Sequence, residues 1–168
     1  MLLLIHAGFI PLVFGLSAVV LGDASSTQDV NATVGKIRSI EVPEDVTNLS
    51  VERGSTSSTG NLEVGYETDY TNDSITVSVT STPNNPVAGA KMKVQGGDLG
   101  AWSELWSYTD GPGQSGGHST SSQTIKSGLS KTDGSVSDLK FQIDAEDVSI
   151  GATNLGESMN FTITYTIG

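Results

Sequence analysis

The sequence predicts an all-β protein, a jelly-roll-like antiparallel β-sandwich preceded by an apolar N-terminal leader. Three observations lead to this fold class. Apolar and polar residues alternate with a period of two after residue 25, and no helical period follows the leader. Clusters of Gly, Pro, Asn and Asp separate the alternating segments. The chain of 168 residues has no cysteine, so packing alone must hold the predicted sheets together.

Residues 1–24 form the apolar leader. No Asp, Glu, Lys or Arg occurs from Met1 to Gly22, and Gly22 and Ala24 are small residues that suit cleavage of a signal peptide. A signal peptide usually starts with Lys or Arg, which residues 1–22 lack. Either the start is mis-assigned and a basic segment lies upstream, or the apolar end is retained as a helix of the type IV pilin kind. A single-pass anchor is the third option. We expect an extracellular or cell-surface protein that meets the membrane only through its leader during export.

Residues 25–42 form a β-patterned N-terminal arm, which precedes a sandwich domain at residues 43–168. Val30, Ala32 and Val34 share one face of the arm, and Gly35 then breaks the alternation before Ile37. A terminal strand either pairs within its own domain or leaves it to complete the sheet of a neighbour. The arm is therefore a candidate donor strand.

Strands are expected in eight further segments, each with apolar residues at alternate positions. They are residues 46–51, 62–70, 75–80, 91–95, 102–108, 120–125, 139–143 and 159–167. Turn-forming residues lie between them at 53–60, 82–86, 95–100, 110–118 and 131–135. The last strand has the clearest pattern, with one face made of Met159, Phe161, Ile163, Tyr165 and Ile167.

Charge and composition exclude several classes of function. The net charge of −11, with eight Lys and Arg in total, would repel a phosphate backbone, so we expect no nucleic-acid partner. His118 is the one histidine after the leader, too few for a histidine metal site or a catalytic triad. We expect no enzymatic activity and no required cofactor. A glycosidase that uses Glu104 with a second carboxylate is the alternative.

Four stretches carry a resemblance to a known group of proteins: "VNATVGKIRSIEVP", "GNLEVGYETDYTNDSITVSVTST", which we interpret as a hairpin, "DLKFQIDAEDVSIG" and "SMNFTITYTIG". Together with the leader, they resemble secreted, cysteine-free jelly-roll subunits that polymerise by donor-strand complementation. These are the TasA and camelysin-like matrix fibres of bacteria and the threads, bundling pili and cannulae of archaea.

The resemblance implies a structural protein of an extracellular filament, pilus or biofilm matrix, and a homopolymer. The arm of one subunit would fill a groove in the next, with four inserted side chains: Val30, Ala32, Val34 and Ile37. A pilin-like subunit that retains its N-terminal helix is one alternative. The other is a secreted module that binds cell-surface glycans. For that module, Trp102, Trp106 and Tyr108 would form a sugar platform on one face of a strand, although large aromatic residues more often belong to the core.

Two kinds of modification or ligand site are also predicted. Asn-x-Ser/Thr sequons, which mark candidate glycosylation sites of an exported protein, occur at Asn31, Asn48, Asn72 and Asn160. A candidate calcium site lies at Asp144, Glu146 and Asp147, since carboxylates between two strands are suitable oxygen ligands. The alternative for the acidic trio is a solvated edge that discourages unwanted strand pairing.

Overall fold

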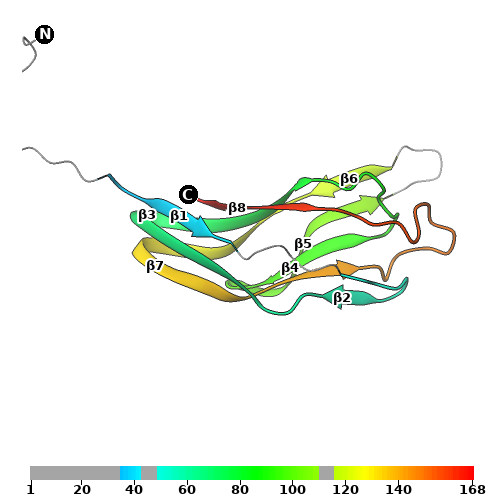
Figure 1. Ribbon diagram of the computed structural model, residues 1–168, viewed down its shortest axis with the longest axis horizontal. Coiled ribbons are helices and arrows are strands. Elements are labelled where there is room, and N and C mark those ends of the chain that lie inside the picture. Colours follow the sequence, from blue (N-terminus) through cyan, green and yellow to red (C-terminus); the bar gives the residue numbers. More distant parts are fainter. Residues whose placement is uncertain (1–34, 43–48, 110–115) are drawn as a thin grey trace, which may run out of the picture. The chain divides into compact units, whose positions relative to one another are not determined.

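All regular structure in the described part of the chain is β-strand, which confirms the all-β prediction. The computed structural model describes residues 35–42, 49–109 and 116–168. They contain eight strands, all paired antiparallel (Figure 1). The strands are β1 (Arg38–Glu41), β2 (Thr56–Ser58), β3 (Leu62–Ser81), β4 (Lys91–Gly96), β5 (Leu99–Thr109), β6 (Gly117–Thr120), β7 (Ser122–Asp144) and β8 (Thr162–Ile167).

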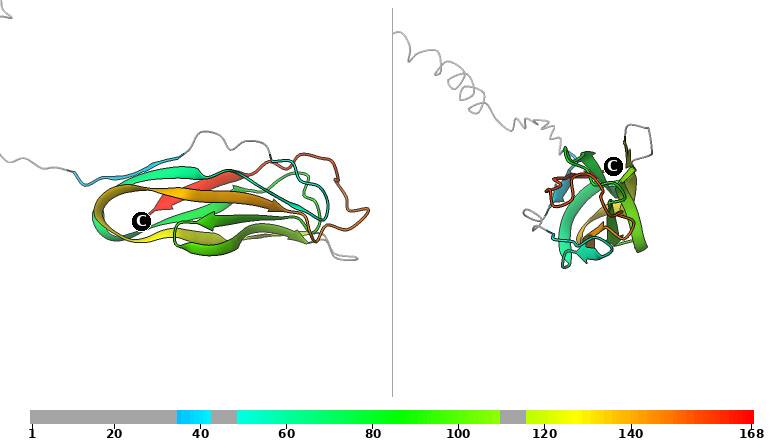
Figure 2. Two further views of the ribbon diagram at one scale, coloured as in Figure 1. Left: turned by 90° about the horizontal axis from the view of Figure 1, so that it is seen from below. Right: turned by 90° about the vertical axis from the view of Figure 1, so that its right-hand side faces the viewer.

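Two long strands, β3 and β7, organise the sheet. They pair from Leu62 opposite Leu139 to Ser78 opposite Ser122, and they curve together at one end of the domain (Figure 2). Successive register shifts mark this bend, between Thr68 and Ile75 of β3. The backbone adopts positive φ angles there, at Asn72 (63°), Gly128 (68°) and Lys131 (47°). Such irregularities bend a strand without ending its pairing.

Two sequence-based predictions are wrong at the bend. Segments 62–70 and 75–80 are one strand, β3, so the hairpin interpretation was wrong. Residues 122–125 and segment 139–143 likewise belong to one strand, β7, whereas Thr120 ends β6, and the predicted turn at 131–135 lies within β7. Polar, turn-forming residues occupy both places, but the chain bends there and continues instead of reversing.

The remaining strands extend the sheet on both sides. On one side of β3, β1 pairs with residues 65–68 and β8 pairs with residues 75–81. The last residues of β7 pair with β2 and with β4, and β5 and β6 follow in order. The predicted strands at 91–95, 102–108 and 159–167 correspond to β4, β5 and β8. β2 lies in a segment that was predicted as a turn.

The curved sheet encloses a single apolar core, which gives the domain a sandwich-like arrangement. Buried side chains alternate with polar ones along the strands, as a pleated sheet with one covered face requires. The largest fully buried side chains are Trp106, Phe141, Ile75, Leu105, Ile125 and Leu139. The inward face of β8 packs on this core, as its alternation predicts.

Several predicted segments lie outside the described residues. These are the leader at 1–24, the arm up to residue 34, and residues 43–48 of the segment predicted as a strand at 46–51. Residues 49–51 of that segment are not in a strand. Within the described ranges, no helix is long and apolar enough to cross a bilayer.

Candidate functional site

A buried carboxylate anchors the start of the domain to β3. Asp73 is 2% exposed and accepts two hydrogen bonds from the Arg38 guanidinium, at 2.9 and 2.8 Å. The buried hydroxyl of Thr68 donates a third bond at 2.5 Å. The Arg38 guanidinium also lies 3.9 Å from the centre of the Tyr70 ring, a cation–π contact. Arg38, Thr68, Tyr70 and Asp73, which we name the Asp73 cluster, join β1 to both sides of the bend in β3.

Electrostatics reinforce the Asp73 cluster. The hydrogen bonds from Arg38, and secondly from Thr68, lower the pKa of Asp73 below its usual value, although burial opposes them. The hydrogen bond to Asp73 raises the pKa of Arg38. Both groups are therefore charged at neutral pH. A bidentate pair of this kind fixes direction as well as distance, so it holds β1 in one register on β3.

Both ends of the described domain lie at the bend. The N–H of Asp69 donates to the carbonyl of Ile37 at 3.0 Å, and the N–H of Ile37 donates to the carboxylate of Asp69 at 2.9 Å. Ser74 and Gly168 exchange two backbone hydrogen bonds, at 2.8 and 3.0 Å. Because Arg38 pairs with Thr68 and Glu41 with Gly65, β1 starts at this end of the domain and runs away from it (Figure 1).

Of the four predicted inserted side chains, one lies in the described part. Ile37 is 48% exposed, and so it is not buried in its own domain. Val30, Ala32 and Val34 lie outside the described residues. The arm itself is divided: residues 38–41 pair within the chain's own sheet as β1, which is the first of the two alternatives predicted for it.

The outer side of β8 is an open sheet edge. Ser74 and Gly168 form a hydrogen-bonded pair, and in an antiparallel ladder such pairs recur at every second residue. The residues of β8 between them turn their backbone N–H and C=O away from β3. These residues are Ile163, Tyr165 and Ile167. Among the described residues, β8 pairs with β3 alone, and no other backbone hydrogen bond reaches these three residues. Such an edge is a template for another strand.

Exposed apolar side chains lie at the end of the domain opposite the bend. Ile150 is 84% exposed and Leu155 is 45% exposed. Both belong to the segment between β7 and β8, which lies beyond the first residues of β8 (Figure 1). The open edge of β8 therefore runs from an apolar end of the domain to the end at which β1 starts.

The predicted sugar platform is not a single face. β5 has a register shift, with Met92 opposite Trp106 and Lys93 opposite Glu104, so the alternation changes between Glu104 and Trp106. Trp106 is fully buried, donates a hydrogen bond to His118 Nδ1 at 3.1 Å, and packs on Phe161.

Tyr108 also packs against the core, whereas Trp102 is half-buried and belongs to the outer face. The core alternative is therefore right for Trp106. The bulge, which alternation in the sequence does not reveal, is why the shared-face prediction was wrong.

The acidic trio predicted as a calcium site makes ion pairs with two lysines. Lys93 binds Asp144, and Lys91 binds Asp147 at 2.5 Å. Burial acts to raise the pKa of Asp144, but hydrogen bonds from Lys93 and from the N–H of Glu146 lower it below its usual value. Among the residues that the structure describes, no three potential ligands are grouped around a metal position. Calcium binding stays a prediction.

Two of the four sequons can be placed. Asn72 and Asn160 are exposed, Asn72 at the bend and Asn160 shortly before β8. A glycan on either could extend into solvent. Asn31 and Asn48 lie outside the described residues.

Sequence reasoning missed the most specific feature of this region, the pairing of Arg38 with Asp73. The two residues are far apart in the sequence, and Asp73 lies in a polar stretch that was taken for a turn. The one available signal is that Arg38 is a cation within an otherwise β-patterned arm. Comparison with known protein families, with curated proteins and with solved structures finds no match to this chain.

Proposed function

We propose that this protein is a structural subunit of an extracellular filament, a jelly-roll-like sandwich exported by its apolar leader. Each subunit adds the first part of its N-terminal arm, residues 25–34, as a strand to the next subunit. The observation that carries the proposal is the division of the arm. β1 is fastened to β3 by the Asp73 cluster, and the chain before it enters at one end of the domain.

The open edge of β8 is the acceptor in this proposal. An incoming arm would meet the backbone groups of Ile163, Tyr165 and Ile167, which lack partners among the described residues. It would enter near Ile150 and Leu155, whose exposed side chains it would cover. Donor and acceptor surfaces differ, so the contact is head-to-tail, and head-to-tail contacts that do not close into a ring give open filaments.

The energetics favour an arm with several apolar side chains. Ordering a residue costs about 1–2 kcal/mol, and this cost must be offset along the whole arm. Burial of apolar surface contributes about 25 cal/mol per Å², and the backbone ladder adds about 1 kcal/mol for each hydrogen bond. Val30, Ala32 and Val34 on one face, with exposed Ile37 at the base, supply the apolar surface.

Deletion of residues 25–34 from the exported protein tests the mechanism. Electron microscopy should show fibres from the parent and none from the deletion variant. A Val30→Asp/Val34→Asp protein should also fail to polymerise, whereas Thr33→Asp, on the opposite face of the arm, should form fibres. Normal fibres from the deletion variant would remove the arm from the mechanism.

A pilin-like assembly through a retained apolar helix is the second candidate. Its basis is the uncharged apolar run of residues 1–22, which could be kept as a helix instead of being cleaved. The intact mass of the protein isolated from the filament distinguishes the two, since cleavage near Gly22 or Ala24 removes the whole apolar segment. The same measurement reports glycans at the four sequons.

A further inference from the structure

The outer face of the sheet formed by β4, β5 and the end of β7 is polar. Opposite residues on this face include Gln95 with Lys140 and Lys93 with Gln142. At the β2 end of β7, the lysines are neutralised by Asp144 and Asp147. At the other end of the face, around Gln95 and Lys140, the polar side chains have no such partners among the described residues.

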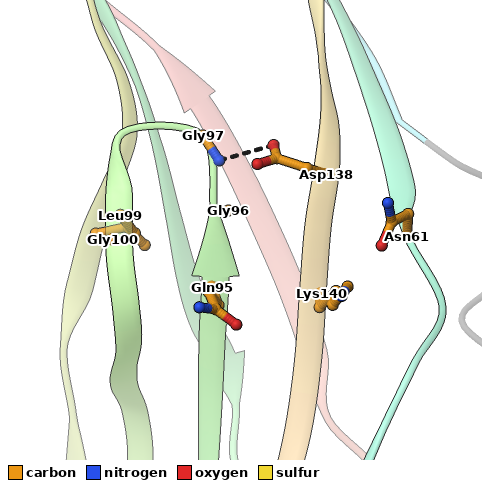
Figure 3. Close-up of a pocket in the computed structure, with 8 residues that line it drawn as sticks. All are labelled: Asn61, Gln95, Gly96, Gly97, Leu99, Gly100, Asp138 and Lys140. Atoms are coloured by element: carbon orange, nitrogen blue, oxygen red, sulfur yellow. Dashed lines mark hydrogen bonds between the residues drawn. The ribbon is translucent and has the colours of Figure 1, made fainter.

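A shallow depression of about 400 Å³ lies at this second end. Figure 3 shows its lining residues on four neighbouring segments: Asn61 before β3, Gln95 on β4, Gly100 on β5, and Asp138 and Lys140 on β7. The segment at Asn61 and strand β5 are the outermost of the four, and three inter-strand spacings, roughly 14 Å in total, separate them. The depression therefore suits an extended ligand better than a single ion.

Glycine backbone forms part of the depression. A Cβ on Gly96 would lie 2.5 Å from the carbonyl oxygen of Asp138, and one on Gly97 would lie 2.0 Å from that of Ile125. The N–H of Gly97 donates to Asp138 Oδ1 at 2.9 Å, which fixes this carboxylate at the rim. At both glycines the backbone of the β4–β5 turn thus lies too close to β7 for a side chain.

The lining offers donors and acceptors in balance. The carboxamides of Asn61 and Gln95 each donate and accept, Lys140 donates, and the second oxygen of Asp138 accepts. One cation and one anion leave the lining with no net charge, and the acidic chain as a whole repels anions. A neutral ligand with many hydroxyl groups matches this arrangement, because each hydroxyl both donates and accepts.

Trp102 adds an aromatic surface beside the depression. It lies two residues from Gly100 on β5, roughly 7 Å along the strand. Its neighbour Ser103 pairs with buried Val94, so Trp102 points to the outer face, together with Glu104. An amphipathic ring that is partly exposed on a polar face is suited to contact a ligand.

We propose that this face binds a neutral polysaccharide. Trp102 stacks on one sugar ring, while Gln95, Lys140 and Asn61 hydrogen-bond the hydroxyls of the adjoining rings. The site does not include the arm, the Asp73 cluster or the edge of β8, so it goes beyond the proposed filament role. In a fibre it would repeat once for each subunit.

The test uses ¹⁹F NMR of the full chain labelled with 5-fluorotryptophan, isolated as the host exports it. The chain has two tryptophans, so two signals are expected, and Trp102→Phe assigns them. The probes are linear hexasaccharides of glucose and of N-acetylglucosamine, with a sulfated hexasaccharide as an anionic comparison. The Trp102 signal should shift saturably with at least one neutral probe, and buried Trp106 should not respond.

Variants locate the site. Trp102→Ala should weaken binding by about tenfold or more, and Gln95→Ala and Lys140→Ala by roughly three- to tenfold each, the loss expected for one hydrogen bond. Lys131→Ala, at the exposed bend, is the matched control and should bind normally. No shift with any neutral probe at millimolar concentration, a response confined to Trp106, or tighter binding of the sulfated probe would overturn the proposal. Deletion of residues 25–34 should leave the Trp102 shift intact, so failure of this site and failure of the filament mechanism are distinguishable.

Discussion

The guanidinium of Arg38 and the buried carboxylate of Asp73 form a two-bond ion pair that ties β1 to β3 across its bend. Removing one member of a buried pair is more harmful than replacing both, because a buried charge loses its partner. We expect Arg38→Met to lower the free energy of unfolding, and Arg38→Met/Asp73→Leu to recover part of the loss.

Chemical denaturation measures the effect, and Lys126→Met is the matched control. Lys126 and Asp98 form a longer, more exposed pair, at 3.6 Å with side chains 37% and 39% exposed, so its loss should cost roughly 0–1 kcal/mol. Equal losses for Arg38→Met and Lys126→Met would contradict an anchoring role for Arg38.

Acid should weaken the domain through three aspartates. Hydrogen bonds hold the pKa of each below its ordinary value of 3.8: from Arg38 to Asp73, from Ser127 to Asp98, and, against the effect of burial, from Lys93 to Asp144. The folded state thus binds fewer protons than the unfolded state in this range. The stability that these groups contribute is present above pH 3.8 and is lost as the pH falls through their folded pKa values.

Thermal unfolding between pH 7 and pH 2 checks this expectation. The melting temperature should be nearly constant above about pH 5 and fall steeply below pH 4. Asp98→Asn should reduce the slope of the fall, since it removes one of the three groups. A melting temperature that is flat or rises toward pH 2 would contradict the prediction.

Gly97 should tolerate no side chain. Its φ angle is +59°, and a Cβ would clash with the carbonyl of Ile125. We expect Gly97→Ala to cost more than the roughly 1–2 kcal/mol of the left-handed backbone alone. Gly100→Ala is the control, because no atom lies within 4 Å of its Cβ position, and it should change stability by at most about 0.5 kcal/mol. Unfolding curves of equal midpoint for the two variants would contradict the clash.

Tyr165, on the inward face of β8, should titrate late. Burial raises the pKa of its phenol to about 12, from an ordinary value of 10.0. Because the folded pKa is the higher one, the stability from this neutral phenol is present below pH 10 and is lost as the pH rises through 12. Ultraviolet titration should show a phenolate step near pH 12 that Tyr165→Phe lacks. An unchanged titration curve in the variant would show that Tyr165 is not the group responsible.

Alternation in the sequence was a good guide where a strand is regular. The inward set of Phe161, Ile163, Tyr165 and Ile167 follows directly from it, and these residues pack on the core. Alternation gave wrong faces where a strand contains a bulge. One extra residue at Leu105 reverses the faces, so Trp102 and Trp106 lie on opposite sides of β5.

The bend could not be predicted for a similar reason. Residues such as Asn72 and Asp133 favour turns, but they do not indicate whether the chain reverses or only curves. That outcome depends on the partner strand, since β7 bends at the same place and keeps its pairing with β3. The Asp73 cluster depends on the bend and was therefore also hidden from sequence reasoning.

The antiparallel alignment of β1 on β3 has a mechanical consequence. A force that draws residue 35 outward along the strand axis would load the β1–β3 hydrogen bonds in shear, all at once, and the Arg38 side chain would share that load. Peeling would break the same bonds one after another at much lower force. The β1–β3 pairing should thus resist a pull along the strand better than a pull directed across the sheet.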